Sequence, residues 1–333
     1  MQRWHVPNSM AIIILIFSII CLNTTTASIE NPDTIQYLEV VIEETKDHNV
    51  SSWTQGLLIH EGYFYESTGK RGESSLQKIN ISTGITEKIF FHNDSIFAEG
   101  LTLFNETLIQ LTYVSNVAFV FDLESFDLIR TYDYSGEGWG ICTMSEFFVM
   151  SDGSSQLTLR DLETFQSIGT VNVTKNGMSL SYLNELECIG DMVYSNVWLT
   201  DEIVVIDIET GIVNSTIDAS GILSDAEYEN ADVLNGIAYD ENNSEFWITG
   251  KYWPHIFQIT LEESDILIES DSINNTVEEN DTKINERFVD SNSFVISILI
   301  LLMVGIIIWT IDLKIRDNSE KTQVQELSGE YYG

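Results

Sequence analysis

The chain has 333 residues, with 52 Asp and Glu against 15 Lys and Arg, which gives a formal net charge of −37 at pH 7. This balance excludes proteins that bind nucleic acids through a basic surface. It is typical of a well-solvated surface, and it can attract cationic ligands over a distance. The length allows one large domain or two small ones.

The first element along the chain is an apolar run of 13 residues, Met10 to Leu22, which follows Arg3 and precedes the small residues around Ala27. Such a run is too short to cross a bilayer comfortably, and the small residues suit cleavage by a signal peptidase. We therefore expect residues 1–28 to be a signal peptide, with a retained signal anchor as the alternative.

A repeat follows between residues 29 and 262, where short β-rich runs alternate with Gly, Asn and Asp turns. Five segments share the order of a short strand, a turn, an alternating strand and a third strand, at spacings of 44, 40, 45 and 51 residues. Four short strands per unit of this length are typical of a β-propeller blade, so the sequence predicts an all-β, five-bladed β-propeller. A solenoid is the alternative, but the units have no helix or coil of uniform length. The first strands begin at the equivalent positions Gln55, Glu99, Trp139, Asn184 and Asn235.

The innermost strands of a propeller run along a central channel, so we expect these five positions to converge at one mouth. A concave place with aromatic walls and a few polar groups is the usual form of a small-molecule site. The alternative is that the polar residues only line a wet tunnel. Residues 35–45 are expected to supply an outer strand that closes the ring with the last blade, which also removes exposed edges.

The end of the chain predicts a membrane anchor. Residues 263–292 are polar and acidic, which favours a largely disordered stalk. Residues 293–311 are 19 residues without a charge, enough for one transmembrane helix, and Lys314 and Arg316 follow at once. With residues 312–333 as a cytosolic tail, we expect a single-pass type I membrane protein whose main domain lies in the secretory pathway or at the cell surface.

The composition between the two apolar runs suits this compartment. Two cysteines are present there, Cys142 and Cys188, and a disulfide or two buried free thiols are both open. N-glycans are expected because nine N-x-S/T sequons lie in this region, at Asn49, Asn80, Asn93, Asn105, Asn172, Asn214, Asn242, Asn274 and Asn280.

Nine collinear motifs, among them WTQGL, FAEGLT, EGWGI, LNELE, SNVWLTDEIVVID and TGKYWP, together resemble the plant and bacterial type of glutaminyl cyclase. The resemblance covers residues 50–261. It implies a five-bladed propeller, in agreement with the repeats, and a glutaminyl-peptide cyclotransferase activity that converts N-terminal glutamine into pyroglutamate with release of ammonia. The implied partners are peptides and proteins that begin with glutamine.

By motif, the resemblance assigns the acid of the site to Glu99 and its polar partners to Gln55, Asn184 and Lys251. The reaction requires a proton to leave the α-amine and another to reach the leaving nitrogen, and one carboxylate with a raised pKa can do both. We expect Glu99 to be this proton shuttle and the three partners to hold the developing negative oxygen or orient the substrate. The alternative for Glu99 is a structural carboxylate satisfied by a turn or by Lys251.

The aromatic walls are expected to stack on the substrate and exclude water, and the alternative is packing between blades. Trp53 stands where the family usually has phenylalanine, and Tyr113 stands where it usually has tryptophan. Both positions are still aromatic, so the wall is retained while the substrate preference is open. The residues concerned are Phe97, Trp139, Trp198, Tyr113 and Trp53.

No catalytic metal site is predicted, because the five histidines are scattered and no H-x-x-x-H or C-x-x-C motif occurs. This excludes the zinc-dependent animal type of glutaminyl cyclase, and we expect catalysis without a cofactor. The resemblance allows a structural calcium ion in the channel. The competing function is a catalytically inactive propeller that binds a peptide or a glycan at the channel mouth.

Overall fold

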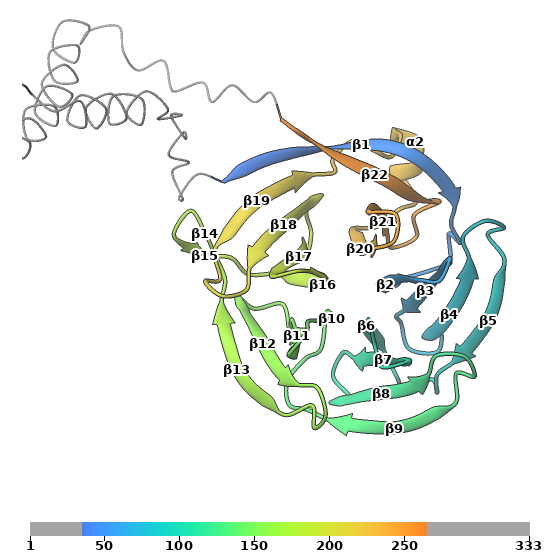
Figure 1. Ribbon diagram of the computed structural model, residues 1–333. Coiled ribbons are helices and arrows are strands. Elements are labelled where there is room, and N and C mark those ends of the chain that lie inside the picture. The colour runs from blue at the N-terminus through green and yellow to red at the C-terminus, as the bar shows by residue number, and fades with distance from the viewer. Residues whose placement is uncertain (1–34, 265–333) are drawn as a thin grey trace, which may run out of the picture. The chain divides into compact units, whose positions relative to one another are not determined.

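The computed structural model describes residues 35–264, which form an all-β, propeller-like ring (Figure 1). The expected signal peptide, transmembrane helix and cytosolic tail lie outside these residues, as does the stalk from residue 265 onward. Within residues 35–264, no helix has the length and apolar character needed to cross a membrane.

Three sheets of the ring each contain four antiparallel strands in chain order, with the first strand nearest the centre (Figure 1). The strands are β2 (Thr54–His60), β3 (Tyr63–Thr68), β4 (Ser75–Asn80) and β5 (Thr86–Phe91); β6 (Ala98–Phe104), β7 (Thr107–Thr112), β8 (Val117–Asp122) and β9 (Leu128–Asp133); and β10 (Ile141–Thr143), β11 (Phe147–Met150), β12 (Gln156–Asp161) and β13 (Ser167–Asn172).

An eight-stranded sheet, made of two further groups of four strands, completes the ring. Its first group is β16 (Leu183–Ile189), β17 (Met192–Val197), β18 (Glu202–Asp207) and β19 (Val213–Asp218). Its second group is β20 (Leu234–Asp240), β21 (Glu245–Gly250), β22 (His255–Glu263) and the N-terminal strand β1 (Gln36–Asp47).

The N-terminal strand closes the ring. β1 pairs antiparallel with β22, with Val41 opposite Thr260, and it pairs parallel with β19, with Leu38 opposite Ile217. The prediction that the first strand of the domain forms the outer strand of the last unit is therefore confirmed.

One turn recurs between the third and fourth strands of four units. At the end of β8, the Asp122 carboxylate accepts hydrogen bonds from the backbone N–H groups of Glu124 and Ser125, at 3.2 and 2.7 Å. Side chains of this type hold a turn by binding the backbone two and three residues further on. The same pair of bonds is made by Asn80, Asp161 and Asp207.

The inner strands approach one another closely, and glycines make this approach possible. A Cβ on Gly56 of β2 would lie 2.5 Å from the backbone nitrogen of Leu101 on β6. A Cβ on Gly100 would lie 2.7 Å from the carbonyl oxygen of Trp139, just before β10. Since no side chain fits there, these glycines bring the starts of neighbouring inner strands together.

The hydrophobic core lies between neighbouring sheets. Leu58 and Tyr65 of the first sheet pack in one buried cluster with Leu108 and Phe121 of the second. A disulfide between Cys142 on β10 and Cys188 on β16 also joins two units, so the question of cysteine pairing is answered. Two small elements were not predicted, the hairpin β14–β15 (Thr174–Lys175, Met178–Ser179) and the helix α2 (Asp225–Tyr228).

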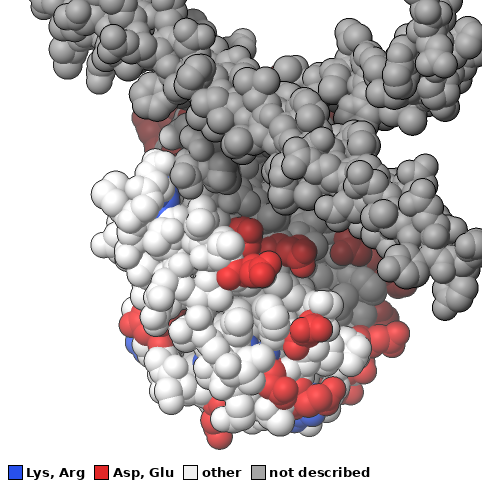
Figure 2. All heavy atoms as spheres, turned by 60° about the vertical axis from the view of Figure 1, so that its left-hand side comes forward, with Lys and Arg blue, Asp and Glu red and all other residues white. Residues whose placement is uncertain are grey.

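The surface reflects the composition. Figure 2 shows one face of the molecule with many more Asp and Glu than Lys and Arg side chains. None of the seven sequon asparagines within residues 35–264 is fully buried, since five are exposed and two are half-buried.

Candidate active site

The register of the inner hairpins places all nine predicted site residues at one end of the ring. Gln55, Glu99 and Asn184 are each the second residue of an inner strand. The strand register pairs the starts of β2, β6, β16 and β20 with the ends of β3, β7, β17 and β21. The other predicted residues lie at the same end. Trp53 and Phe97 directly precede β2 and β6, and Trp139 lies two residues before β10. Tyr113, Trp198 and Lys251 directly follow β7, β17 and β21.

Glu99 is a buried carboxyl group, with 5% of the residue exposed. Burial raises its pKa well above the usual range, and the neighbouring Glu137 raises it further, while the charge of Lys251 opposes the shift. Its backbone is fixed because the hydroxyl of Ser67 donates a hydrogen bond to the Glu99 carbonyl. Glu99 is therefore a buried carboxyl group whose raised pKa favours the protonated form, an environment that is common at functional sites.

Lys251 is the buried cation of the site, with 4% of the residue exposed. Burial lowers the pKa of its ammonium group, and the charges of Glu99 and Asp232 counteract part of that shift. Its main chain is held on both sides, because its N–H donates to Val233 and its carbonyl accepts from Asp232. Among residues 35–264, no ion pair within 4.0 Å joins Lys251 to Glu99, so Lys251 is not locked onto this acid.

Gln55 is oriented by a residue to which the sequence assigned no role. The side-chain N–H of Asn235 donates to Gln55 Oε1 at 3.2 Å and to the carbonyl of Thr54 at 3.0 Å. With its oxygen occupied in this way, Gln55 presents its amide N–H groups as donors. The repeat predicts that Asn235 lies in the ring, but its contact with Gln55 depends on side-chain conformation, which the repeat does not predict.

Aromatic rings surround these polar groups in two sets. Trp139 and Trp198 meet edge to face, with their centroids 5.5 Å apart. Phe97 and Tyr113 lie 5.8 Å apart. All four residues are half-buried, as is Trp53, so packing between the sheets leaves part of each residue exposed.

The polar and the aromatic residues of the site approach each other closely around Gly69. A Cβ at this position would lie 2.5 Å from the ring of Phe97, 2.9 Å from Gln55 Cγ and 3.0 Å from the ring of Trp53. Two segments that are far apart in the sequence, one with Trp53 and Gln55 and one with Phe97, therefore crowd around one glycine. Gly69 gives them room to meet.

Two further charged residues belong to this end of the ring. Glu137 accepts a hydrogen bond of 2.9 Å from Trp139 Nε1. Partial burial and the charges of Glu137 and Glu99 raise the pKa of Tyr113. Lys70 Nζ lies 4.1 Å from the centroid of the Trp53 ring and 4.5 Å from that of Tyr252. The EGWG motif was a signal for Glu137, but Lys70 lies in a turn with no pattern that marks it.

Between residues 35 and 264, no group of three or more His, Cys, Asp and Glu side chains is arranged to hold a metal ion. The calcium ion that the resemblance allows stays a prediction, because Ca²⁺ also binds backbone carbonyl and side-chain amide oxygens.

Comparisons with known proteins show to which family the chain belongs. A family model described as glutamine cyclotransferase matches residues 13–261. The chain is 35% identical to a glutaminyl-peptide cyclotransferase of Arabidopsis thaliana over 243 residues, which cover 72% of this chain and 75% of that protein. It is 34% identical to the glutaminyl cyclase of Myxococcus xanthus, whose crystal structure superposes with a TM-score of 0.63 and covers 70% of this chain and 100% of that one. The chain belongs to the glutamine cyclotransferase family.

Proposed function

We propose that this protein is a glutaminyl-peptide cyclotransferase in which Glu99 moves the proton of the reaction. Family membership supports the activity. The observation that favours the role of Glu99 is its burial, with a raised pKa, at the end of the ring where Lys251 and Gln55 also lie. Phe97 and Trp139 would provide walls on which the substrate can stack.

The reaction can be written with side chains alone. The neutral α-amine of the glutamine attacks its own side-chain carbonyl, a C–N bond forms, and the bond to the amide nitrogen breaks to release ammonia. Glu99 as carboxylate takes one proton from the attacking amine and returns it to the leaving nitrogen, so the enzyme ends unchanged. The nucleophile is already tethered, so holding an attack-ready conformation supplies much of the rate.

The negative oxygen that forms during attack needs fixed donors. Lys251 in its charged form and the amide of Gln55 are the candidates, and both are buried, where such contacts are strongest. Asn184 is buried beside them on β16 and can orient the substrate amide. Trp53 Nε1 is buried without a partner among residues 35–264, which makes it a donor for a carbonyl of the peptide.

The structure also bears on where the protein acts. We propose a lumenal or extracellular domain on a single membrane span, with N-glycans on its surface. The Cys142–Cys188 disulfide supports an oxidising compartment. The absence of a fully buried sequon asparagine among residues 35–264 is compatible with glycosylation. The anchor itself is proposed on the sequence of residues 293–311 alone.

The test is ammonia release and pyroglutamate formation by the full-length protein on a peptide that begins with glutamine. We expect activity in the parent and a loss of about 100-fold or more in kcat for Glu99→Gln. Glu106→Gln, in the turn that follows the opposite end of β6, is the matched control and should retain parental activity. A folded parent without activity on several peptides would favour a binding propeller, and a fully active Glu99→Gln would assign the proton transfer to another group.

A further inference from the structure

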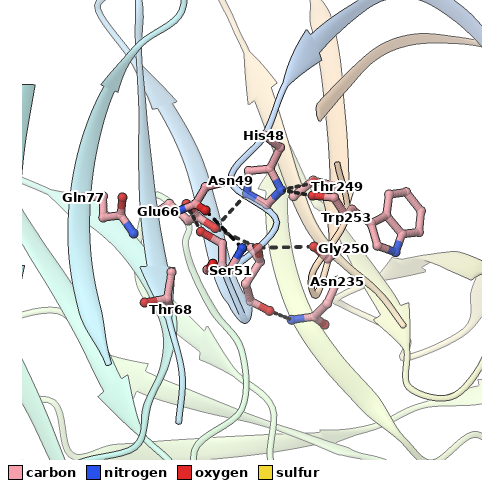
Figure 3. A network of polar contacts seen from close by, with 12 residues as sticks. His48, Asn49, Ser51, Glu66, Thr68, Gln77, Asn235, Thr249, Gly250 and Trp253 are labelled. Carbon is pink, nitrogen blue, oxygen red and sulfur yellow. Dashed lines mark hydrogen bonds and ion pairs between the residues drawn. The ribbon is translucent and has the colours of Figure 1, made fainter. Parts of the chain in front are cut away.

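Figure 3 shows a network of polar contacts that contains a fully buried ion pair, between His48 and Glu66. His48, the residue after β1, and Glu66 on β3 have side chains that are 1% and 0% exposed. His48 Nε2 lies 3.1 Å from Glu66 Oε1, and His48 Nδ1 lies 2.8 Å from the carbonyl oxygen of Trp253. Neither residue is used in the reaction proposed above.

The partners of His48 define its charge. A carboxylate and a carbonyl only accept hydrogen bonds, so each ring nitrogen must carry a proton to satisfy them. Thr249 Oγ1 is also within 3.4 Å of Nδ1, but its hydroxyl donates to the carbonyl of His255 at 2.8 Å. Burial alone would lower the pKa of His48, yet Glu66 and the Trp253 carbonyl raise it. The geometry corresponds to an imidazolium beside a carboxylate.

Glu66 extends this pair to the strand that carries Gln55. Its Oε1 accepts a hydrogen bond of 2.7 Å from the hydroxyl of Thr54, and its Oε2 accepts one of 3.2 Å from the hydroxyl of Ser52. These two residues flank Trp53 and precede Gln55. The segment 52–55 is therefore attached to the ion pair on one side.

His48 extends the pair to the segment that carries Lys251. Its ring binds the Trp253 carbonyl, and its backbone N–H donates to the Pro254 carbonyl at 2.7 Å. The two segments also meet directly, since the N–H of Tyr252 donates to the carbonyl of Ser52 at 2.7 Å. Lys251 Nζ lies 5.2 Å from the centroid of the Trp53 ring.

We propose that His48 and Glu66 are positioning residues that hold Lys251 in register with Trp53 and Gln55. A buried ion pair stabilises a fold little compared with apolar residues of equal volume, but it can fix one arrangement against others. Here it joins the end of the ring-closing strand to two segments of the site that are nearly 200 residues apart in sequence. The expected effect of this pair on catalysis rests on the proposed function. Its expected effect on the structure rests on geometry alone.

The sharpest variant is Thr54→Val, which removes the hydroxyl that links Glu66 to the inner strand while it keeps the side-chain volume. We expect kcat to fall at least about tenfold because the donors around the reacting carbonyl are displaced. KM should change by less than about twofold, since the aromatic walls of Trp139 and Trp198 are untouched. Thr54→Ser restores the hydroxyl and should recover most of the parental kcat.

A matched control separates positioning from simple loss of stability. Thr143→Val removes a partly buried hydrogen bond of 2.8 Å to Thr102, between inner strands at the other end of the ring. This variant should lower the melting temperature without changing kcat at 25 °C. If Thr54→Val behaves in the same way, with parental kcat and only a lower melting temperature, the pair is merely structural and the proposal is wrong.

Amide hydrogen exchange tests the proposal even if the parent proves inactive. In Thr54→Val and in Glu66→Gln, the amides of Lys251 and Tyr252 should exchange at least about tenfold faster, because local opening becomes easier. Amides of β12 should keep their parental rates. Unchanged exchange at Lys251 and Tyr252 in a folded Thr54→Val protein would overturn the proposal, whereas an inactive parent with the expected exchange pattern would overturn only the proposed function.

Discussion

Glu185 on β16 accepts a hydrogen bond of 2.9 Å from the backbone N–H of Ile237 on β20, and one of 3.3 Å from the N–H of Leu57 on β2. In the other four units the equivalent position is glycine, at Gly56, Gly100, Gly140 and Gly236, with Gly140 directly before β10. Glu185 is therefore the one residue with a side chain among these five equivalent positions, and it connects its own unit to the backbones of two others. It lies directly beside the site residue Asn184.

Replacing Glu185 by alanine should destabilise the domain. The substitution leaves two buried N–H groups without an acceptor, at a cost of about 1–3 kcal/mol each. Chemical denaturation at pH 7 would measure this loss. Glu185→Gln keeps an acceptor oxygen and should lose less; an alanine variant as stable as the parent would show that the two contacts contribute nothing.

Glu185 should also make stability depend on pH. Burial raises its pKa to about 8, so between its ordinary pKa and this value the folded state binds more protons than the unfolded state. Stability should then fall as pH rises through that window. In Glu185→Gln this part of the pH dependence should disappear, which denaturation curves at pH 5, 6.5 and 8 would reveal as a flatter profile.

Glu99→Gln should separate stability from activity. The raised pKa of Glu99 means that its ionised form is unfavourable in the folded protein. An uncharged amide of similar shape should therefore leave the melting temperature unchanged or higher at pH 8, although activity is lost. A melting temperature several degrees below that of the parent would indicate that the carboxylate is held by favourable contacts instead.

Lys251→Met should lower kcat about 100-fold or more, by removal of a charged donor from a buried site. Because burial lowers the pKa of Lys251, the parental rate should decline as pH rises through that lowered value. The residual activity of the variant should lack this decline. Lys88→Met, on the outer strand β5, provides the control and should keep both the rate and the pH profile of the parent.

Gly153→Ala should displace a wall of the site. Gly153 has a φ of +79°, and a Cβ there would lie 2.6 Å from the ring of Trp139. We expect KM for a glutamine peptide to rise severalfold. Gly62→Ala offers the same backbone strain, with a φ of +81° and no atom within 4 Å of the added carbon. Equal KM values in the two variants would argue against a substrate contact for Trp139.

Loss of the disulfide should affect stability and spare activity. Cys142 and Cys188 lie further along their strands than Trp139 and Asn184, away from the site end. Replacing both by serine should reduce the free energy of unfolding by about 2–5 kcal/mol. Steady-state kinetics well below the melting temperature should match the parent, and a large drop in kcat would mean that the bond shapes the site.

The sequence predicted the repeats and the positions at which the inner strands begin, because both follow from main-chain periodicity. Glu99 and Gln55 stand at two of these positions, and the closing role of the first strand was predicted as well. The assignment of Lys251 and of most aromatic walls came from the resemblance to the family. The contact of Asn235 with Gln55, and that of His48 with Glu66, depend on which rotamers meet across unit boundaries. Periodicity carries no information on such contacts, since they differ from one unit to the next.

The pairing of β1 with β22 also has a consequence for how the chain folds. The closing sheet joins Leu38 to Glu263, so nearly the whole domain must be synthesised before its first strand finds its antiparallel partner β22. Contacts of such sequence separation form slowly, and until then β1 exposes an unpaired edge in the nascent chain. Deletions that remove residues 256–263 should therefore cause aggregation during synthesis rather than loss of one local contact.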